Sequence, residues 1–313
     1  MPLRRPRATL LRLLGAAGAL ALPGCSLEPD ELLPPLPPGH PVAYVSQGLS
    51  GSADIFLLSA DAQSDVNLTS FTSYEAWPSW SPHGLQIAFE SNGGETDPTQ
   101  TEIYVLTVGI PGVQRLTHDT AFTSAQPAWS PLGDRIAFVS DRDSAGADIY
   151  LMDPNGTNVT RLTTDTTNEV HPAWAPDGSK LAFAADRDGD NGEIYVMDTT
   201  GANLLNLTND LASADVAPAW SPDGTKIAFQ STREAGTFGI WVMDAADGGN
   251  PARISPASLI CELPSWTPDG MRLAFDCDAD IWVANADGSG LTRITRTTNL
   301  QRGEIHARWK PVP

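Results

Sequence analysis

Acidic side chains recur at one place in a tryptophan-based pattern of this 313-residue sequence. Six tryptophans are each followed two residues later by a proline, and the residue five positions before each tryptophan is most often acidic. The residues at that place are Glu75, Ser124, Glu169, Asp215, Cys261 and Glu304. Repeated carboxylates can bind a cation, bind a basic partner or form structural ion pairs.

Arginines provide partners for two of these acids. In an antiparallel pair of strands Glu169 would face Arg187, and Asp215 would face Arg233. Two interpretations stay open: an ion pair repeated as a structural element, or a site for a cation or a basic partner.

Other possible metal ligands are weaker. His171 and His306 both stand three residues before a repeat tryptophan, but a metal-dependent lyase would need several histidines with acidic support. Residues 186–193 carry acids at alternating positions, as a calcium loop does, although asparagine and Met197 replace its glycine and its closing glutamate. We therefore expect no cofactor, with calcium in this turn as the alternative.

Two cysteines stand where other copies of the pattern have an acid and an arginine. Around the turn at 269–270, Cys261 would face residue 277 or 278, that is Cys277 or its neighbour, across an antiparallel hairpin. Such neighbours are close enough for a disulfide if their side chains point the same way, which a one-residue change of register would prevent. Export to an oxidising compartment favours the disulfide, and two free thiols are the alternative.

A repeat of 43 to 49 residues positions all these side chains. The tryptophan is followed by a turn with glycine and then by an apolar triplet, such as residues 227–229. A second β-rich run, such as residues 193–196 of another copy, and a short third run, such as residues 161–163 of a further copy, complete the repeat. Four short strands at this period indicate a β-propeller with one blade per repeat. The repeat tryptophans are Trp80, Trp129, Trp174, Trp220, Trp266 and Trp309.

The two ends of the chain complete one blade. Three runs over residues 42–69 match the second, third and fourth strands of a blade, and residues 306–311 match a first strand. We therefore predict an all-β, six-bladed propeller of four-stranded blades. Pairing of the C-terminal inner strand with the N-terminal three strands would close it and protect strand edges.

The N-terminal residues predict export and anchoring. Residues 1–24 join a basic start to a short apolar run, as a bacterial signal peptide does. Residues 22–25 (Leu-Pro-Gly-Cys) resemble a lipobox, so Cys25 is expected to be lipidated; a free Cys25 after ordinary cleavage is the alternative. Residues 25–41 form a proline-rich tether before the propeller at 42–313.

The repeat resembles that of TolB-type propellers. The shared elements are Pro-x-Trp-Ser-Pro-Asp-Gly, Ile-Ala-Phe, Ile-Tyr-x-Met-Asp and Arg-Leu-Thr, over about residues 42–310. In that family the propeller follows an α/β domain, works in the periplasm and docks onto the peptidoglycan-associated lipoprotein. The resemblance implies a propeller-only, lipid-anchored relative on the periplasmic side of the envelope, with the outer membrane as the expected membrane.

We expect a binding module rather than an enzyme, with an envelope protein or peptide as partner. The excess of 38 acidic over 19 basic residues argues against nucleic acid. The predicted partner-binding rim consists of Glu75, Glu169, Asp215 and Glu304 in the loops between blades, and Glu75 and Glu304 lack an arginine partner. The alternative is a propeller enzyme, a metal-dependent saccharide lyase or hydrolase acting in the central funnel.

Lipidation of Cys25 is directly testable. Firm membrane attachment takes more than one acyl chain, so the modified N-terminus and not the propeller would hold the protein to the membrane. Metabolic labelling with a palmitate analogue should mark the wild type and leave Cys25→Ala unmarked. Equal labelling of the two proteins would contradict the prediction.

Overall fold

The computed structural model describes residues 40–47, 52–60, 64–93, 100–119, 121–143, 146–189, 191–234, 237–278, 280–295 and 304–311. The predicted signal, Cys25 and tether lie outside these residues, except at residues 40 and 41. Within them, twenty-four strands form six four-stranded sheets. No helix in the described part of the chain has the length and apolar character needed to cross a membrane.

Each sheet is one antiparallel blade, and five of the six use four consecutive strands. Their bounds are β4 (Glu75–Trp80), β5 (Gln86–Ser91), β6 (Glu102–Thr107) and β7 (Ile110–Arg115); β8 (Ser124–Trp129), β9 (Ile136–Ser140), β10 (Asp148–Met152) and β11 (Thr160–Arg161); β12 (Glu169–Trp174), β13 (Lys180–Ala185), β14 (Glu193–Asp198) and β15 (Leu205–Asn206); β16 (Asp215–Trp220), β17 (Lys226–Ser231), β18 (Gly239–Asp244) and β19 (Ala252–Arg253); β20 (Cys261–Trp266), β21 (Arg272–Cys277), β22 (Asp280–Asn285) and β23 (Thr292–Arg293).

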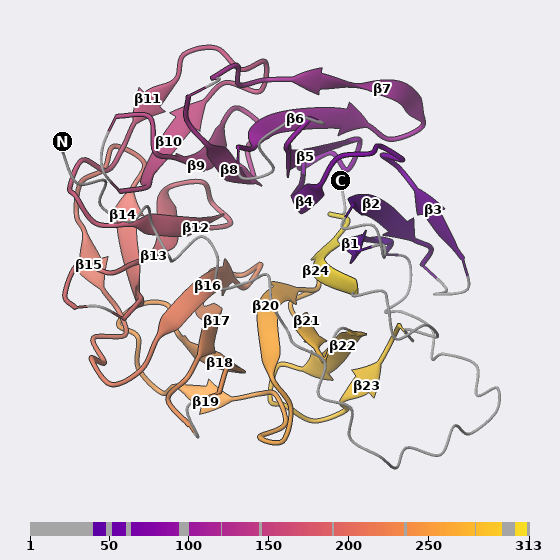
Figure 1. Ribbon diagram of the computed structural model, residues 1–313. Helices are drawn as coiled ribbons and strands as arrows, with labels where there is room; N and C mark the ends of the chain where they lie inside the picture. The colour runs from indigo at the N-terminus through magenta and orange to yellow at the C-terminus, as the bar shows by residue number, and fades with distance from the viewer. Residues whose placement is uncertain are drawn as a thin grey trace, which may run out of the picture. The chain divides into compact units, whose positions relative to one another are not determined.

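The sixth blade joins the two ends of the described chain. Its strand order is β24-β1-β2-β3, with β24 (Glu304–Trp309) pairing antiparallel to β1 (Val42–Gln47), which is followed by β2 (Ala53–Leu58) and β3 (Asp65–Asn67). The inner strand β24 also contacts the inner strands β20 and β4 of both neighbouring blades (Figure 1). The predicted six-bladed propeller and its closure are confirmed.

The middle strands of the blades are buried on both faces. Every residue of β9 and β10 is buried, because neighbouring blades cover both sides of each sheet. This explains why the sequence shows continuous apolar triplets there instead of alternation. The phenylalanine that ends each triplet is fully buried in five blades, at Phe89, Phe138, Phe183, Phe229 and Phe275.

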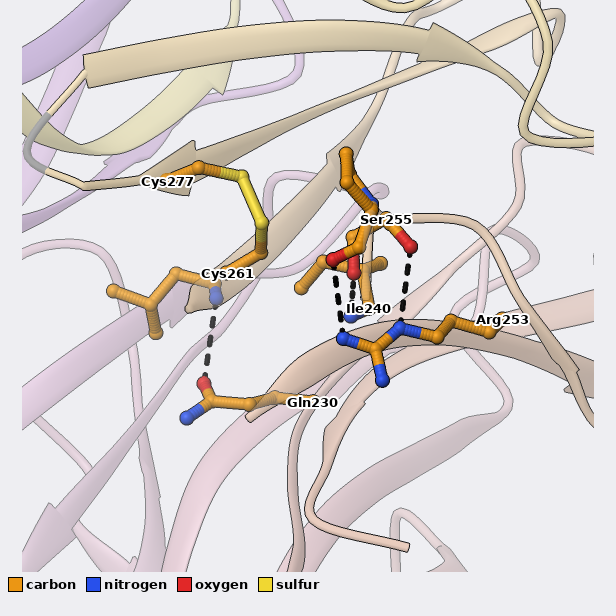
Figure 2. Close-up of a disulfide and its surroundings, with 8 residues drawn as sticks. Gln230, Ile240, Arg253, Ser255, Cys261 and Cys277 are labelled. Atoms are coloured by element: carbon orange, nitrogen blue, oxygen red, sulfur yellow. Dashed lines mark hydrogen bonds between the residues drawn. A yellow bond between two sulfur atoms is a disulfide. The ribbon is translucent and has the colours of Figure 1, made fainter. Parts of the chain in front are cut away.

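The recurring Arg-Leu-Thr run fixes the outer strand to the third strand. In every blade the hydroxyl of its Thr or Ser accepts a hydrogen bond from a backbone N–H in the third strand, as Ser255 does from Ile240 at 2.9 Å (Figure 2). The other pairs, given acceptor first, are Thr69–Ile55, Thr117–Ile103, Thr163–Ile149, Thr208–Ile194 and Thr295–Ile281. These bonds hold outer strands that are only two or three residues long in several blades.

A disulfide links the inner strand of one blade to the second strand of the same blade. Cys261 of β20 is directly opposite Cys277 of β21 in the ladder, with the Cα atoms 4.3 Å apart, and the two sulfur atoms are bonded (Figure 2). Both residues are buried. At this place the two preceding blades carry the ion pairs Glu169–Arg187 and Asp215–Arg233, so the covalent bond occupies the same structural position.

Ring closure can be tested by truncation. Ending the chain at residue 303 removes β24, whose Trp309 is 6% exposed, and leaves an edge of β1 unpaired. Loss of one buried tryptophan alone costs about 3–5 kcal/mol, so the melting temperature should fall by roughly 10 °C, with aggregation. A chain ending at residue 311 is the control, and equal melting of the two truncations would contradict the assignment.

The disulfide should stabilise the propeller. Its sequence separation is 16 residues, and closing a loop of about this size contributes ~3 kcal/mol in the chain-entropy model. Replacing both cysteines by alanine should lower the free energy of unfolding by about that amount, and reductant should destabilise only the wild type. Alkylation of both thiols in the unfolded wild type without reductant would show that the bond is absent.

Candidate functional site

A funnel of about 500 Å³ opens along the central channel, at the end of the inner strands where the repeat tryptophans stand. Its walls are mainly tryptophan and proline, from the Trp-x-Pro pattern and from the proline two residues before each tryptophan in five blades. Trp77, Gln126, His171 and Ala217 also line it, three residues before a repeat tryptophan and therefore deeper along the strands. The repeat motif thus provides the walls and the preceding position provides the floor.

The floor position has the same unusual backbone in every blade. All six residues there have positive φ, between 52° and 59°, although none is glycine: Trp77, Gln126, His171, Ala217, Leu263 and His306. In the five blades made of four consecutive strands, the pairing register between the first and second strands shifts at the floor residue. In β12, for example, the shift lies between Val170 and Ala173. A left-handed non-glycine residue costs about 1–2 kcal/mol, so other contacts must hold each bulge.

Side chains from the preceding blade provide these contacts. A polar residue in the second strand of that blade accepts the floor residue's N–H in three cases. Glu90 accepts from Gln126 at 2.9 Å, Gln230 from Leu263 at 3.4 Å, and Asp276 from His306 at 2.8 Å. A buried N–H needs an acceptor, so these buried polar side chains have a structural task.

In two preceding blades the corresponding residue of the second strand is a valine, whose side chain cannot accept a hydrogen bond. There the side chain of that blade's own floor residue accepts the N–H instead. Gln126 accepts from the N–H of His171 at 2.7 Å, and the Nδ1 atom of His306 accepts from Trp77 at 3.4 Å. The corresponding valines are Val139 and Val45. Five of the six bulges are therefore linked to the blade before them, which couples the floor around the channel.

The indole of Trp77 reaches across the floor. Its ring centroid lies 4.9 Å from that of His171 and 4.5 Å from that of His306, on two different blades. Burial, with a smaller contribution from the charge of Arg308, lowers the pKa of His171 to about 3. Burial also lowers the pKa of His306 well below its usual value. Both imidazoles are neutral at pH 7, and the two buried ring nitrogens of His171 have no hydrogen-bond partner among the described residues.

Arg308 is the cation among the described residues that line the funnel. It precedes the last repeat tryptophan, where the other five blades have only small residues: Ser79, Ala128, Ala173, Ala219 and Ser265. Its Nη1 donates to the carbonyl oxygen of Ala307 at 2.9 Å. Burial lowers the pKa of this guanidinium, and the charge of Asp276 acts in the opposite direction. The funnel is therefore built from one repeated pattern with a single charged exception.

The predicted acidic rim is wrong for three of its members. Glu75, Glu169 and Asp215 each begin an inner strand, at the end away from the funnel, and all three are 0% exposed. They cannot meet a partner directly, because adjacent strands and loops cover them. The side chain of Glu304 lies outside the described residues.

These buried acids have internal partners. Arg187 pairs with Glu169 at 3.0 Å and Arg233 with Asp215 at 2.6 Å, so the predicted ion pairs are confirmed. Glu75, which lacks an arginine, accepts hydrogen bonds from Ser73 and from Ser91. Burial raises the pKa of Glu75, and the two serine hydrogen bonds partly oppose this.

The aspartates of the suspected calcium turn point to different partners. Asp186 accepts from the backbone and side chain of Asn168, and Asp188 accepts from the hydroxyl of Tyr195 at 2.5 Å. Asp190 is not among the described residues. In the described ranges no three His, Cys, Asp or Glu side chains gather as metal ligands would.

Arg308 and the acceptors of the floor were not singled out from the sequence. A signal existed for Arg308, since aligning the six tryptophans places one arginine in a column of serine and alanine. No comparable signal marks the side chains that accept the floor N–H groups. The residues at the bulges have positive φ but are not glycine, so the sequence does not reveal where the bulges lie.

Comparison with known proteins places this fold in a family. A family model described as the TolB beta propeller domain matches residues 34–171, 95–209 and 167–275 in overlapping stretches. The chain belongs to the TolB β-propeller family. The resemblance read from the repeat is thereby confirmed. A search of the curated proteins found no match.

Solved structures share the fold at low sequence identity. TolB from Acinetobacter baumannii is 21% identical with a TM-score of 0.72, over 87% of this chain and 67% of that one. A putative TolB from Agrobacterium tumefaciens is 20% identical with a TM-score of 0.66, over 88% of this chain and all of that one. A chain of a nidogen/laminin complex reaches a TM-score of 0.68 at 12% identity, over 87% of this chain and 98% of that one. These likenesses concern the fold alone.

The buried acceptors of this TolB-family propeller predict a pH dependence. Burial raises the pKa of Glu90 to about 7 and that of Asp276 to about 8, above the values near ~4 in an unfolded chain. The folded state then binds more protons than the unfolded state, so the free energy of unfolding should rise as pH falls from about 8 to about 6.5. Below about pH 6.5 the neutral His171 and His306 oppose this gain, since unfolded histidine takes up protons there.

Asp276→Asn isolates this effect. Asparagine keeps an oxygen that can accept the His306 N–H, but it does not ionise. At pH 8 the variant should be more stable than the wild type by about 1 kcal/mol. Its melting temperature should also change less with pH than that of the wild type. The exposed Asp278→Asn serves as the control, and a loss of stability in Asp276→Asn that is the same at pH 6.5 and pH 8 would contradict the assignment.

Proposed function

We propose that the protein is a non-enzymatic binding module of the bacterial cell envelope, which holds a segment of an envelope protein or peptide in the tryptophan-lined funnel. A lipid on Cys25 would attach it to the membrane, with the outer membrane as the expected site. The observation that carries the proposal is the funnel itself, about 500 Å³ with walls of tryptophan and proline.

The funnel has the chemistry of a recognition site. Pockets for small ligands or chain segments are concave and mostly apolar, with a few polar groups that fix orientation. Aromatic grooves bind extended, proline-rich segments in several peptide-binding domains. Here rigid indole and proline rings provide the apolar wall, and Arg308 and His171 provide the polar groups.

An extracytoplasmic location is supported by three features. The Cys261–Cys277 disulfide fits an oxidising compartment, and the chain belongs to the TolB β-propeller family, two solved members of which carry the name TolB. The basic and apolar N-terminal residues add a signal for export.

A binding role accounts for the funnel better than catalysis. Nucleophilic catalysis would need a hydroxyl or thiol held by a base. The hydroxyls of Ser79, Ser130 and Ser265 line the funnel, but neither nitrogen of His171 is hydrogen-bonded to them. No observation in the described residues favours the saccharide lyase or hydrolase alternative.

Site-specific photocrosslinking tests the proposal. Leu132 lies in the same turn as the funnel-lining Pro131 and is 64% exposed; Leu211, in a loop that leads into the other end of an inner strand, is 63% exposed and gives a matched control. A photoreactive residue at 132 should capture envelope polypeptide in cells, and one at 211 should not. Capture at 211 alone, or equal capture at both, would contradict the proposal.

A further inference from the structure

Arg308 has hydrogen-bonding capacity that the fold does not use. A guanidinium carries five N–H donors, and within the described ranges the side chain of Arg308 makes one hydrogen bond, to the carbonyl oxygen of Ala307. It forms no ion pair there, while ten other arginine or lysine contacts reach a carboxylate. The fold does not require a cation at this place either, since the other five blades have serine or alanine.

The carboxylate whose charge acts on Arg308 already has a structural task. Asp276, whose charge acts on Arg308, uses one oxygen to accept the N–H of His306, and its other oxygen is buried without a partner. Since burial raises the pKa of Asp276 to about 8, Asp276 offsets little of the arginine charge at neutral pH.

A second polar group without a partner lines the same funnel. His171 is 9% exposed, and neither of its ring nitrogens is hydrogen-bonded to any residue that the structure describes. A neutral imidazole has one N–H donor and one acceptor, and leaving both unused in a buried place is costly. The funnel therefore holds two sets of unused polar groups between apolar walls, which is the arrangement expected of a site whose ligand completes it.

The floor limits what can enter. Trp77 contacts the rings of His171 and His306 on two other blades, so its indole lies across the channel. A segment that enters from the tryptophan end meets this layer. An internal segment would have to enter the funnel and leave it again on the same side, which needs room for two strands of chain. A chain end needs room for only one, so it fits a funnel that the indole closes at the bottom.

We propose that the funnel recognises the C-terminal carboxylate of a polypeptide, which Arg308 binds while His171 hydrogen-bonds to the last residue and the tryptophan and proline walls cover its apolar side chains. This inference rests on the proposed function and names the chemical group that the binding module recognises. Arginine and carboxylate match in geometry and form two parallel hydrogen bonds. The strongly acidic surface of the protein, with formal charge −19, disfavours acidic segments in general and leaves one isolated carboxylate as the fitting anion.

Retention of a defined peptide pool tests this directly. The probe is a pool of random N-acetylated pentapeptides, prepared once as free acids and once as C-terminal amides, and applied to the immobilised full-length protein. Mass spectrometry then quantifies the retained peptides. Free acids should be retained about tenfold more than amides, as expected for a charged hydrogen-bonded pair.

Two variants replace Arg308 by the residues that the fold accepts elsewhere. Arg308→Ser and Arg308→Ala copy the equivalent positions of other blades, and thermal melts check that they fold. Both should lose the preference for free acids. Arg272→Ser removes an exposed arginine that does not line the funnel, so it should keep the preference.

Each other outcome overturns the inference in a distinct way. A preference that persists without Arg308, or is absent in the wild type, removes the role of Arg308. Amides with internal Asp or Glu retained as strongly as free acids would show a side-chain carboxylate instead of a chain end. Equal retention of acids and amides would end this inference but leave peptide binding standing, whereas retention of neither pool would end both.

Discussion

The whole arrangement depends on one backbone constraint, the left-handed bulge in every inner strand. Six non-glycine residues adopt positive φ at the same place, and each bulge takes an N–H out of the regular ladder. Because a buried N–H must find an acceptor, side chains of the preceding blade reach across the interface, as Glu90 does to Gln126 and Asp276 does to His306. In five of the six blades the N–H of the bulge is thus satisfied by the preceding blade, which makes the ring a coupled unit and not a row of independent sheets.

The bulge also divides the inner strand into two chemical environments. On one side lie buried acids, such as Glu169 paired with Arg187, that tie the first strand to the second. On the other side lie the tryptophan and proline walls of the funnel, with Arg308 among them. The polar groups near the strand starts therefore serve the fold. Within the described ranges, by contrast, Arg308 keeps unused donors and the ring nitrogens of His171 have no hydrogen-bond partner.

The repeat made the fold readable from the sequence, and the antiparallel hairpin made the facing pairs readable as well. The period, the turns and the split blade were sufficient for the six-bladed ring, and Glu169 faces Arg187 because strand pairing brings fixed positions together. Burial was not readable in the same way: the sequence places Glu75 in a loop between blades, but in the structure Glu75 begins β4 and is fully buried. The bulge was equally hidden, since tryptophan, glutamine and histidine at positive φ carry none of the signal that glycine would give.

If the bulge contacts hold the floor in place, the backbone amides that donate to side chains should resist exchange as the strand ladder does. Amide hydrogen exchange measured by NMR on Trp77, Gln126, His171, Leu263 and His306 tests this most directly. The account predicts exchange as slow for these amides as for those of the middle strands, with free energies of opening near that of global unfolding. Fast exchange at these five positions, with slow exchange in the neighbouring strands, would contradict the claim that side chains of the preceding blade fix the channel floor.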